Sequence, residues 1–336
     1  MKVEFENLEG DAPKLAFWKG AREIYVPESL VQSESHSKKI VFTQAALHHP
    51  VYAYSAYLAV LSLYASTDLD RYDVRVYATH NLMEILQDLF KFFPKVKVIQ
   101  YQPLGEIHPE WKREDNDFNT TIKTQFWWDD ELWNYDVVCG LDADLFGVGE
   151  GGSFELLENL QDNILLCPTG NAWEIFEHMM KDLNHNPDKD VVGRLNREHG
   201  ITGVEEKIKA MPWWGNSSLH AFPTKYISDP KYNFVRLLDF WFSEPCYCDE
   251  SFLSIFSIWN DLQIQDINEY LTRSKHHLEH DELFEDKTLP MHLVHYPNQS
   301  AITHRLSTTD SAKALAPRFQ EFLEYTRYNF LKKYAI

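Results

Sequence analysis

Two aspartates, Asp142 and Asp144, directly follow an apolar run, VVCGL, that has the composition of a buried β-strand. Two carboxylates separated by one residue repel each other and resist the loss of their water, so a compensating charge is expected beside them. If the strand continues through the pair, the side chains at i and i+2 point to the same face and both reach one ion. Carboxylates favour hard cations such as Mg²⁺ or Mn²⁺, with phosphate oxygens filling other positions. The stretch therefore predicts a metal site for a phosphate-bearing ligand.

The D-x-D spacing by itself carries little information, because it occurs four times in the chain. The other three pairs lie in polar stretches, where acidic residues are normally solvated. They are Asp68/Asp70, Asp115/Asp117 and Asp188/Asp190. Only the pair Asp142/Asp144 follows an apolar strand, and α/β sheets bind ligands at the carboxyl ends of their strands. A solvated acidic turn without function remains the alternative interpretation of this pair.

Competing motifs fit this stretch poorly. A calcium-binding EF-hand loop needs a third oxygen ligand where Phe146 stands. Phosphatases that resemble haloacid dehalogenases place Thr or Val after a D-x-D near their first strand, whereas Leu145 and Phe146 follow here, after several earlier strands. The P-loop, the dinucleotide-binding glycine pattern, the serine-hydrolase elbow and the H-E-x-x-H zinc motif are absent from the sequence. A phosphohydrolase of the D-x-D type stays open as the second hypothesis.

The aspartates need elements that hold them, and the sequence alternates between strand-like and helix-like stretches. Strands are expected at 38–45, 72–80, 95–102, 135–144, 163–170, 217–224 and 291–298. Helices are expected at 51–66, 81–93, 121–135, 231–243, 249–262 and 316–334, with a helical insert at 171–212. This alternation predicts an α/β sandwich with a mainly parallel central sheet. Because no Gly/Ser- or Pro-rich linker interrupts it, a single domain with insertions is the simplest organisation.

The composition limits the partners. A formal net charge of -19 at pH 7 excludes general attraction to nucleic acid or to an anionic membrane. The longest apolar stretch, 51–66, is too short and too rich in Tyr and Ser for a membrane span, and the N-terminus lacks the pattern of a signal peptide. Four cysteines without a C-x-x-C pair indicate a reduced, cytoplasmic setting. An acidic protein that handles phosphates must then supply positive charge locally, from a metal or from a few basic side chains.

Five stretches match, in order, the motifs of a known family. They are VYAYSAYLAVLSL (51–63), TIKTQFWWDDELWNYDVVCGLDADLF (121–146), WWGNSSLHAF (213–222), CDESFLS (248–254) and MHLVHYPN (291–298). On these motifs the chain resembles GT-A-fold, metal-dependent retaining glycosyltransferases of the glycogenin and galactinol-synthase type. The matches span roughly residues 40–305. The chain departs from the family at His49-Pro50, where Asn-Asp is usual, and at ITHR (302–305), where K-P-W is usual.

The resemblance implies a site for a UDP-sugar and for Mn²⁺ or Mg²⁺. In that site Asp142, Asp144 and His295 would bind the metal. Tyr52 would stack on the uracil, and Asp249 would lie beside the anomeric carbon of the sugar. The implied contacts to the donor are Thr43, Tyr52, Lys123, Asp142, Ala143, Asp144, Ser217, His304 and Arg305, and the implied catalytic group is Lys123, Asn216 and Asp249.

The resemblance also implies an organisation and an activity. The fold would be a GT-A-type, Rossmann-like α/β/α sandwich. Residues 1–38 would be a leader packed on the domain, 39–305 the catalytic domain, with a nucleotide-binding half (39–147) and an acceptor and sugar half (148–305), and 306–336 a C-terminal helix. The activity would be transfer of a hexose from a nucleoside diphosphate sugar to a hydroxyl of a carbohydrate or protein acceptor, with retention at the anomeric carbon. A non-catalytic nucleotide-sugar-binding module is the third hypothesis, and a homodimer is one compatible assembly.

Overall fold

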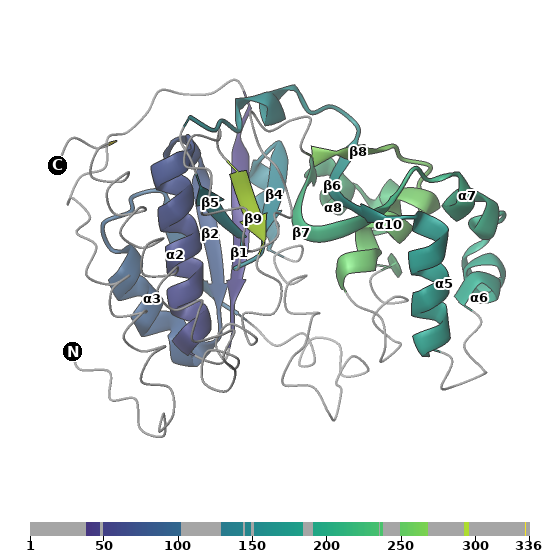
Figure 1. The fold of residues 1–336 in the computed structure, drawn as a ribbon, viewed down its shortest axis with the longest axis horizontal. Helices are drawn as coiled ribbons and strands as arrows, with labels where there is room; N and C mark the ends of the chain where they lie inside the picture. The colour runs from purple at the N-terminus through teal and green to yellow at the C-terminus, as the bar shows by residue number, and fades with distance from the viewer. Residues whose placement is uncertain are drawn as a thin grey trace, which may run out of the picture.

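A seven-stranded sheet with the strand order β3-β2-β1-β4-β7-β6-β8 forms the centre of the described part of the protein (Figure 1). The computed structural model describes residues 38–47, 50–101, 129–143, 145–148, 151–183, 191–234, 236–237, 249–267, 292–295 and 333. The strands of the central sheet are β1 (Ile40–Ala46), β2 (Asp73–Ala78), β3 (Val96–Gln100), β4 (Val137–Leu141), β6 (Ile164–Gly170), β7 (Trp214–Pro223) and β8 (Ile264–Asp266). A separate antiparallel pair is formed by β5 (Leu145–Val148) and β9 (His292–His295).

Every strand of the central sheet except β7 runs in the same direction. The neighbours β3/β2, β2/β1, β1/β4 and β6/β8 pair in parallel, whereas β7 is antiparallel to both β4 and β6. The mixed α/β architecture with a mainly parallel central sheet, predicted from the sequence, is therefore confirmed. The single reversed strand matters for the site, because β7 begins at the edge of the sheet where β1 and β4 end.

Helices cover both faces of the sheet. The α-helices are α2 (Pro50–Ser66), α3 (Met83–Phe90), α5 (Ala172–Leu183), α6 (Val191–His199), α7 (Val204–Ala210), α8 (Lys225–Ser228) and α10 (Asp249–Trp259). Short 3-10 helices lie at η1 (Leu69–Arg71), η2 (His80–Leu82), η5 (Asp130–Asn134), η6 (Glu155–Asn159) and η7 (Pro230–Tyr232). Figure 1 shows α2 and α3 together beside the β1–β2 part of the sheet, with α5, α6 and α7 grouped near its other end. The predicted helical character of the 171–212 insert is confirmed for its described residues.

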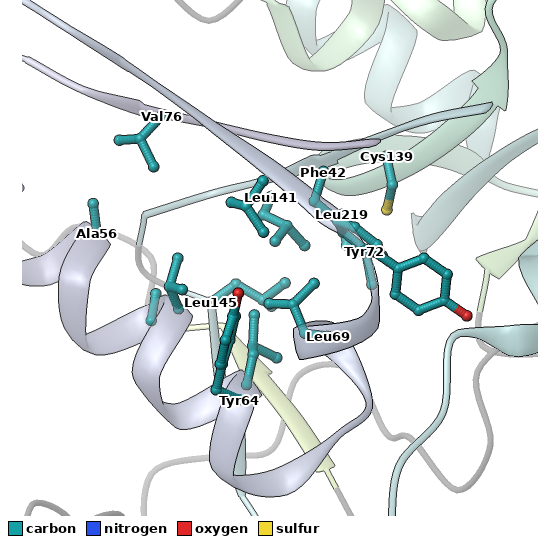
Figure 2. Close-up of a cluster of buried hydrophobic side chains, with 14 of the residues drawn as sticks. Phe42, Ala56, Tyr64, Leu69, Tyr72, Val76, Cys139, Leu141, Leu145 and Leu219 are labelled. Carbon is teal, nitrogen blue, oxygen red and sulfur yellow. The ribbon is translucent and has the colours of Figure 1, made fainter. Parts of the chain in front are cut away.

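Two hydrophobic cores, one on each face, make the protein a three-layer sandwich. Successive side chains of a strand point to opposite faces. Val137, Cys139 and Leu141 of β4 accordingly join one core, and Val138 joins the other. The α2-side core includes Phe42, Ala56, Tyr64, Leu141 and Leu145, which Figure 2 shows converging between α2 and the sheet. The α10-side core includes Val41, Val138, Phe176, Phe222 and Phe252.

The helix α2 has no polar face, which is typical of a helix that is buried around its whole circumference. It spans 17 residues, PVYAYSAYLAVLSLYAS, and most of its side chains are buried. Leu and Ala favour the helical state, and their burial against the sheet and β5 stabilises it further. Among the described residues, no helix combines the length and the apolar character that crossing a membrane requires.

The structure corrects the expected course of the chain at three places. The strand predicted at 135–144 ends at Leu141, and the chain turns at Asp142 and Ala143, so the strand does not continue through the D-x-D pair. Only 129–135 of the helix predicted at 121–135 is described, and it contains the 3-10 helix η5 rather than an α-helix. The helix predicted at 231–243 starts too early, because residues 231 and 232 belong to the 3-10 helix η7 and Asn233 is left-handed. Its residues beyond 237 lie outside the described part, as do residues 1–37 of the predicted leader and most of the C-terminal helix.

Gly140 is required by the packing of β4 against β7. A Cβ atom at Gly140 would lie 2.1 Å from Cε1 of His220, its partner across the ladder. His220 is buried and its ring stacks on Phe222, so it has little room to move. We therefore expect Gly140→Ala to lower the free energy of unfolding by about 1–3 kcal/mol, measured by urea denaturation.

Two further variants test whether the contact with His220 causes this loss. Gly170→Ala is the matched control in β6, because its Cβ would meet only the side chain of Ile175, with Cδ1 at 3.2 Å and Cγ1 at 3.9 Å. It should cost less than Gly140→Ala. In the double variant Gly140→Ala/His220→Ala the two effects should be less than additive, because the clash disappears with the ring. Simple additivity would show that His220 does not restrict position 140.

Candidate functional site

Asp142 lies at the carboxyl end of β4, in a tight turn that leads into β5. Its backbone N–H donates to the carbonyl oxygen of Ser218 on β7 at 2.8 Å, and its own carbonyl accepts from the N–H of Leu145 at 3.1 Å. The residue is half-buried. The backbone of Asp142 is therefore fixed between two strands at the edge of the sheet.

The strand β9 reaches this turn from far along the chain. In the ladder between β5 and β9, His295 lies opposite Leu145, the residue that follows Asp144. Asp144 itself and the His295 side chain lie outside the described part. The structure thus brings the backbone of His295 beside the D-x-D segment, and the binding of a metal by His295 stays a prediction.

The strand β7 carries two more predicted site residues to the same edge. Asn216 and Ser217 directly precede Ser218, whose carbonyl accepts from Asp142. Asn216 pairs with Cys167 across the ladder to β6. Their position in β7 places both residues just beyond the end of β4.

The helix α10 approaches the same part of β7. The N–H of Gly215 donates to Oγ of Ser254 at 3.3 Å. Asp249, the first residue of α10, precedes Ser254 by little more than one helical turn, or about 7.5 Å along the axis. The predicted residue Asp249 therefore begins a helix that is attached directly beside Asn216.

Residues of β1 and α2 complete this edge. Tyr52 lies in the first turn of α2, is half-buried and packs against the α2-side core. One turn later, Oγ of Ser55 donates to the carbonyl of Ala143 at 2.6 Å. Thr43 on β1 is fully buried, and its hydroxyl donates to the carbonyl of Cys139 at 3.4 Å. The hydroxyl of Thr43 is therefore engaged within the sheet, whereas Tyr52 lies at the end of α2 that contacts the turn.

The cysteines of the sheet do not supply a reactive thiolate. Cys139 on β4 and Cys167 on β6 are both free and fully buried. Burial raises the pKa of both thiols, because the charged form loses its water. Nucleophilic or metal-binding chemistry by these two side chains is therefore disfavoured.

Several predicted site residues are not placed by the structure. Lys123, Asp144, His304 and Arg305 lie outside the described residues. Within the part that is described, no three side chains of His, Cys, Asp or Glu gather closely enough to hold a metal ion. What the structure does bring together is the backbone that carries Asp142, Ala143, His295 and Asn216.

Two residues at this edge have no signal in the sequence. Gln44 on β1 donates through Nε2 to the carbonyl of Asp142 at 3.3 Å, and Ser55 holds Ala143 as described above. Both bonds go to backbone carbonyls of residues far away along the chain. A contact to a distant backbone leaves no pattern of residue types, so neither residue can be found from sequence motifs.

No protein-family model and no curated protein sequence matches the chain. Among solved structures, it is similar to the bifunctional glycosyltransferase WbbM, with a TM-score of 0.49 and 12% identity, over 85% of this chain and 52% of that one. It is also similar to mouse xyloside xylosyltransferase 1, with a TM-score of 0.44 and 12% identity, over 78% of this chain and 98% of that one. A third is the galactosyltransferase LgtC in complex with donor and acceptor sugar analogs, with a TM-score of 0.45 and 14% identity, over 85% and 95%. The chain spans about half the length of WbbM.

Proposed function

We propose that the protein is a glycosyltransferase that moves a sugar from a nucleoside diphosphate sugar, with UDP-hexose as the donor, to a hydroxyl acceptor. The observation that supports this most is the meeting of four elements at one edge of the sheet. The turn after β4 carries Asp142, and β9 pairs beside it at His295. The start of β7 carries Asn216, and the first turn of α2 carries Tyr52. Ligands of open α/β sheets bind at this edge.

The residues at the turn fit a divalent cation by their chemistry. Asp142, Asp144 and His295 would offer two carboxylates and one imidazole, a set that suits Mn²⁺ or Mg²⁺ with phosphate oxygens in the remaining positions. The register of β5 with β9 supports this set, because it brings His295 next to the D-x-D segment. When bound, the ion neutralises the negative charge that develops on the diphosphate leaving group.

The other residues would bind and orient the donor. Tyr52 would stack on the base from the first turn of α2. Asn216 and Ser217 would face the sugar from β7, and Asp249 would lie beside the anomeric carbon at the start of α10. Lys123, His304 and Arg305 remain predicted contacts to the phosphates. The phosphate-binding charge would therefore come from a few groups in an otherwise acidic chain.

The acceptor side of the reaction is part of the same proposal. Retention at the anomeric carbon would follow from attack by the acceptor hydroxyl on the face that the leaving group occupies, and such attack needs no strong nucleophile from the protein. We propose residues 39–147 as the nucleotide-binding half and 148–305 as the half that holds the sugar and the acceptor. The helical insert 171–212, with α5, α6 and α7, and the C-terminal segment of the chain are proposed to recognise the acceptor.

Thermal stability with nucleotides tests the proposal directly. UDP at about 100 times its Kd should stabilise the fold by roughly 2.7 kcal/mol when Mn²⁺ is present, because a ligand that binds only the folded state shifts the unfolding equilibrium. GDP and CDP are the comparison ligands, and chelation of the metal is the control. A rise in melting temperature with UDP that needs Mn²⁺ would justify a screen of UDP-sugars. The absence of a shift with every nucleotide would contradict the proposed donor site.

A further inference from the structure

We propose that Gln44 and Ser55 are positioning residues that fix the backbone of the turn carrying Asp142 and Asp144, an inference that rests on the proposed function. Neither residue would touch the donor or the ion. Their role would be to set the direction in which the two carboxylates point.

Two successive carbonyls of the turn are held by side chains from different elements. The carbonyl of Asp142 accepts from Nε2 of Gln44 on β1 at 3.3 Å, and the carbonyl of Ala143 accepts from Oγ of Ser55 on α2 at 2.6 Å. Both donors are buried, Gln44 at 1% and Ser55 at 0% exposure, whereas the acceptor residues Asp142 and Ala143 are half-buried. Together with the bond from Asp142 to Ser218, the turn is attached to β1, β7 and α2 at once.

This attachment matters because β4 ends before the aspartates. Beyond the bond from the N–H of Asp142 to Ser218, β7 no longer fixes the peptide planes, and rotation of a peptide plane redirects the side chains on either side of it. A functional site tolerates errors of only about 0.5 Å in the placement of its groups. Hydrogen bonds to the carbonyls of Asp142 and Ala143 restrict this rotation, and so would orient the carboxylate of Asp142 and the peptide that leads to Asp144.

Gln44 places a polar amide at a buried position, and among the described residues only its donor group is bonded. Of the residues that the structure describes, none bonds to its Oε1, which is buried. A buried acceptor without a partner costs about 1–3 kcal/mol, which a methionine of similar shape would avoid. The amide group therefore contributes through Nε2, and the acceptor of that bond is the carbonyl of Asp142.

The helix α2, which carries Ser55, also contacts β5, the strand that follows the turn. Oγ of Ser62 accepts from the N–H of Gly147 in β5 at 3.0 Å. A Cβ at Gly147 would lie 2.1 Å from Oγ of Ser66, so the helix and β5 pack in close contact. Because β5 pairs with β9, α2 aligns the segment opposite His295 as well as the turn.

The test compares Ser55→Ala and Gln44→Met with a matched control, Ser66→Ala. Ser66 is also buried in α2 and packs against Gly147 of β5, but its hydroxyl donates to the carbonyl of Ser62 in its own helix and not to the turn. Mn²⁺ affinity in the presence of UDP is measured by titration calorimetry, and stability without metal or nucleotide by urea denaturation. We expect the first two variants to weaken Mn²⁺ binding by about 10-fold each, as loss of an outer-shell partner does. Ser66→Ala should bind Mn²⁺ as the unchanged protein does.

The outcomes separate this inference from the proposed function. Unchanged Mn²⁺ affinity in both Ser55→Ala and Gln44→Met would overturn the positioning role while leaving the metal site in place. Equal weakening in Ser66→Ala would overturn it too, because the effect would then follow general loss of stability. If the unchanged protein binds no Mn²⁺ with UDP, the proposed function fails and the inference fails with it. Gln44→Met keeps the volume of the side chain, and so still tests the turn if Ser55→Ala does not fold.

Discussion

Asp142→Asn is expected to weaken UDP binding in the presence of Mn²⁺ by more than about 100-fold, while leaving the fold intact. Removal of an outer-shell partner already costs 10–100-fold in metal affinity, so loss of a charged ligand should cost more. The backbone bonds of Asp142 to Ser218 and Leu145 do not involve its side chain and should persist. Without metal the variant should be no less stable than the unchanged protein, because one of two neighbouring like charges is removed. Titration calorimetry with UDP and Mn²⁺ measures the first effect and urea denaturation the second.

Asp130→Asn is the matched control for this prediction. Asp130 is exposed in η5, just before β4 begins, and therefore lies at the opposite end of the strand from Asp142. The control makes the same chemical change and alters the net charge equally. It should leave UDP affinity unchanged. Retained Mn²⁺-dependent binding in Asp142→Asn would remove Asp142 from the proposed metal ligands.

Most strands of the central sheet could be predicted from the sequence because their signals are local, whereas the three-residue strand β8 (Ile264–Asp266) was not expected. The runs that form β1, β2 and β6 are short, apolar and bounded by helices or turns. The apolar stretch 51–66 is too long for an ordinary strand, so it predicts a helix. The dependence on local signals also explains why the sequence does not predict the turn at Asp142. Leu145 and Phe146 resume the strand pattern directly after the pair, so the local signal reads as one strand. In the structure β4 ends at Leu141, since β5 leaves the central sheet to pair with β9.

The arrangement of the site depends on pairings that no local signal contains. The position of β7 between β4 and β6, and its reversed direction, follow from contacts between distant segments. The backbone pairing of β9 with β5 places His295 opposite Leu145, and its role as a metal ligand stays a prediction. Gln44 and Ser55 could not be predicted, because each acts on a backbone carbonyl and any residue type carries one.

Arg75→Met is expected to lower the free energy of unfolding by about 3 kcal/mol at neutral pH. Arg75 on β2 is buried, with its side chain 6% exposed, and its guanidinium lies 2.8 Å from the Asp129 carboxylate and 2.6 Å from that of Glu131. These contacts attach η5, the segment that leads into β4, to the sheet. Removing the cation leaves the Asp129 carboxylate, 16% exposed, with the hydroxyl of Tyr77 and the backbone N–H of Glu131 as its donors among the described residues. Loss of one partner of a buried pair typically costs about 3–5 kcal/mol, and the lower figure applies because water still reaches Asp129. Urea denaturation measures the loss.

Arg71→Met is the matched control, because Arg71 is 34% exposed and its contact with Asp68 is 3.5 Å long. A surface pair of this kind contributes about 1 kcal/mol or less, so this variant should lose much less stability than Arg75→Met.

The pH dependence separates the loss of charge at position 75 from a loss of packing. Hydrogen bonds from Lys97, the larger effect, and from Arg75 lower the pKa of Glu131 from 4.5 to about 2. A carboxyl whose pKa is depressed in the folded state stabilises it fully above the unfolded pKa, and this contribution disappears as the pH falls toward the folded pKa. In Arg75→Met the pKa of Glu131 should move back toward 4.5, so part of this contribution is already lost. The difference in stability between the variant and the unchanged protein should therefore shrink as the pH falls from about 5 to about 2. A difference that stays constant over this range would show that Arg75 stabilises η5 by packing of its aliphatic stem, rather than through the two carboxylates.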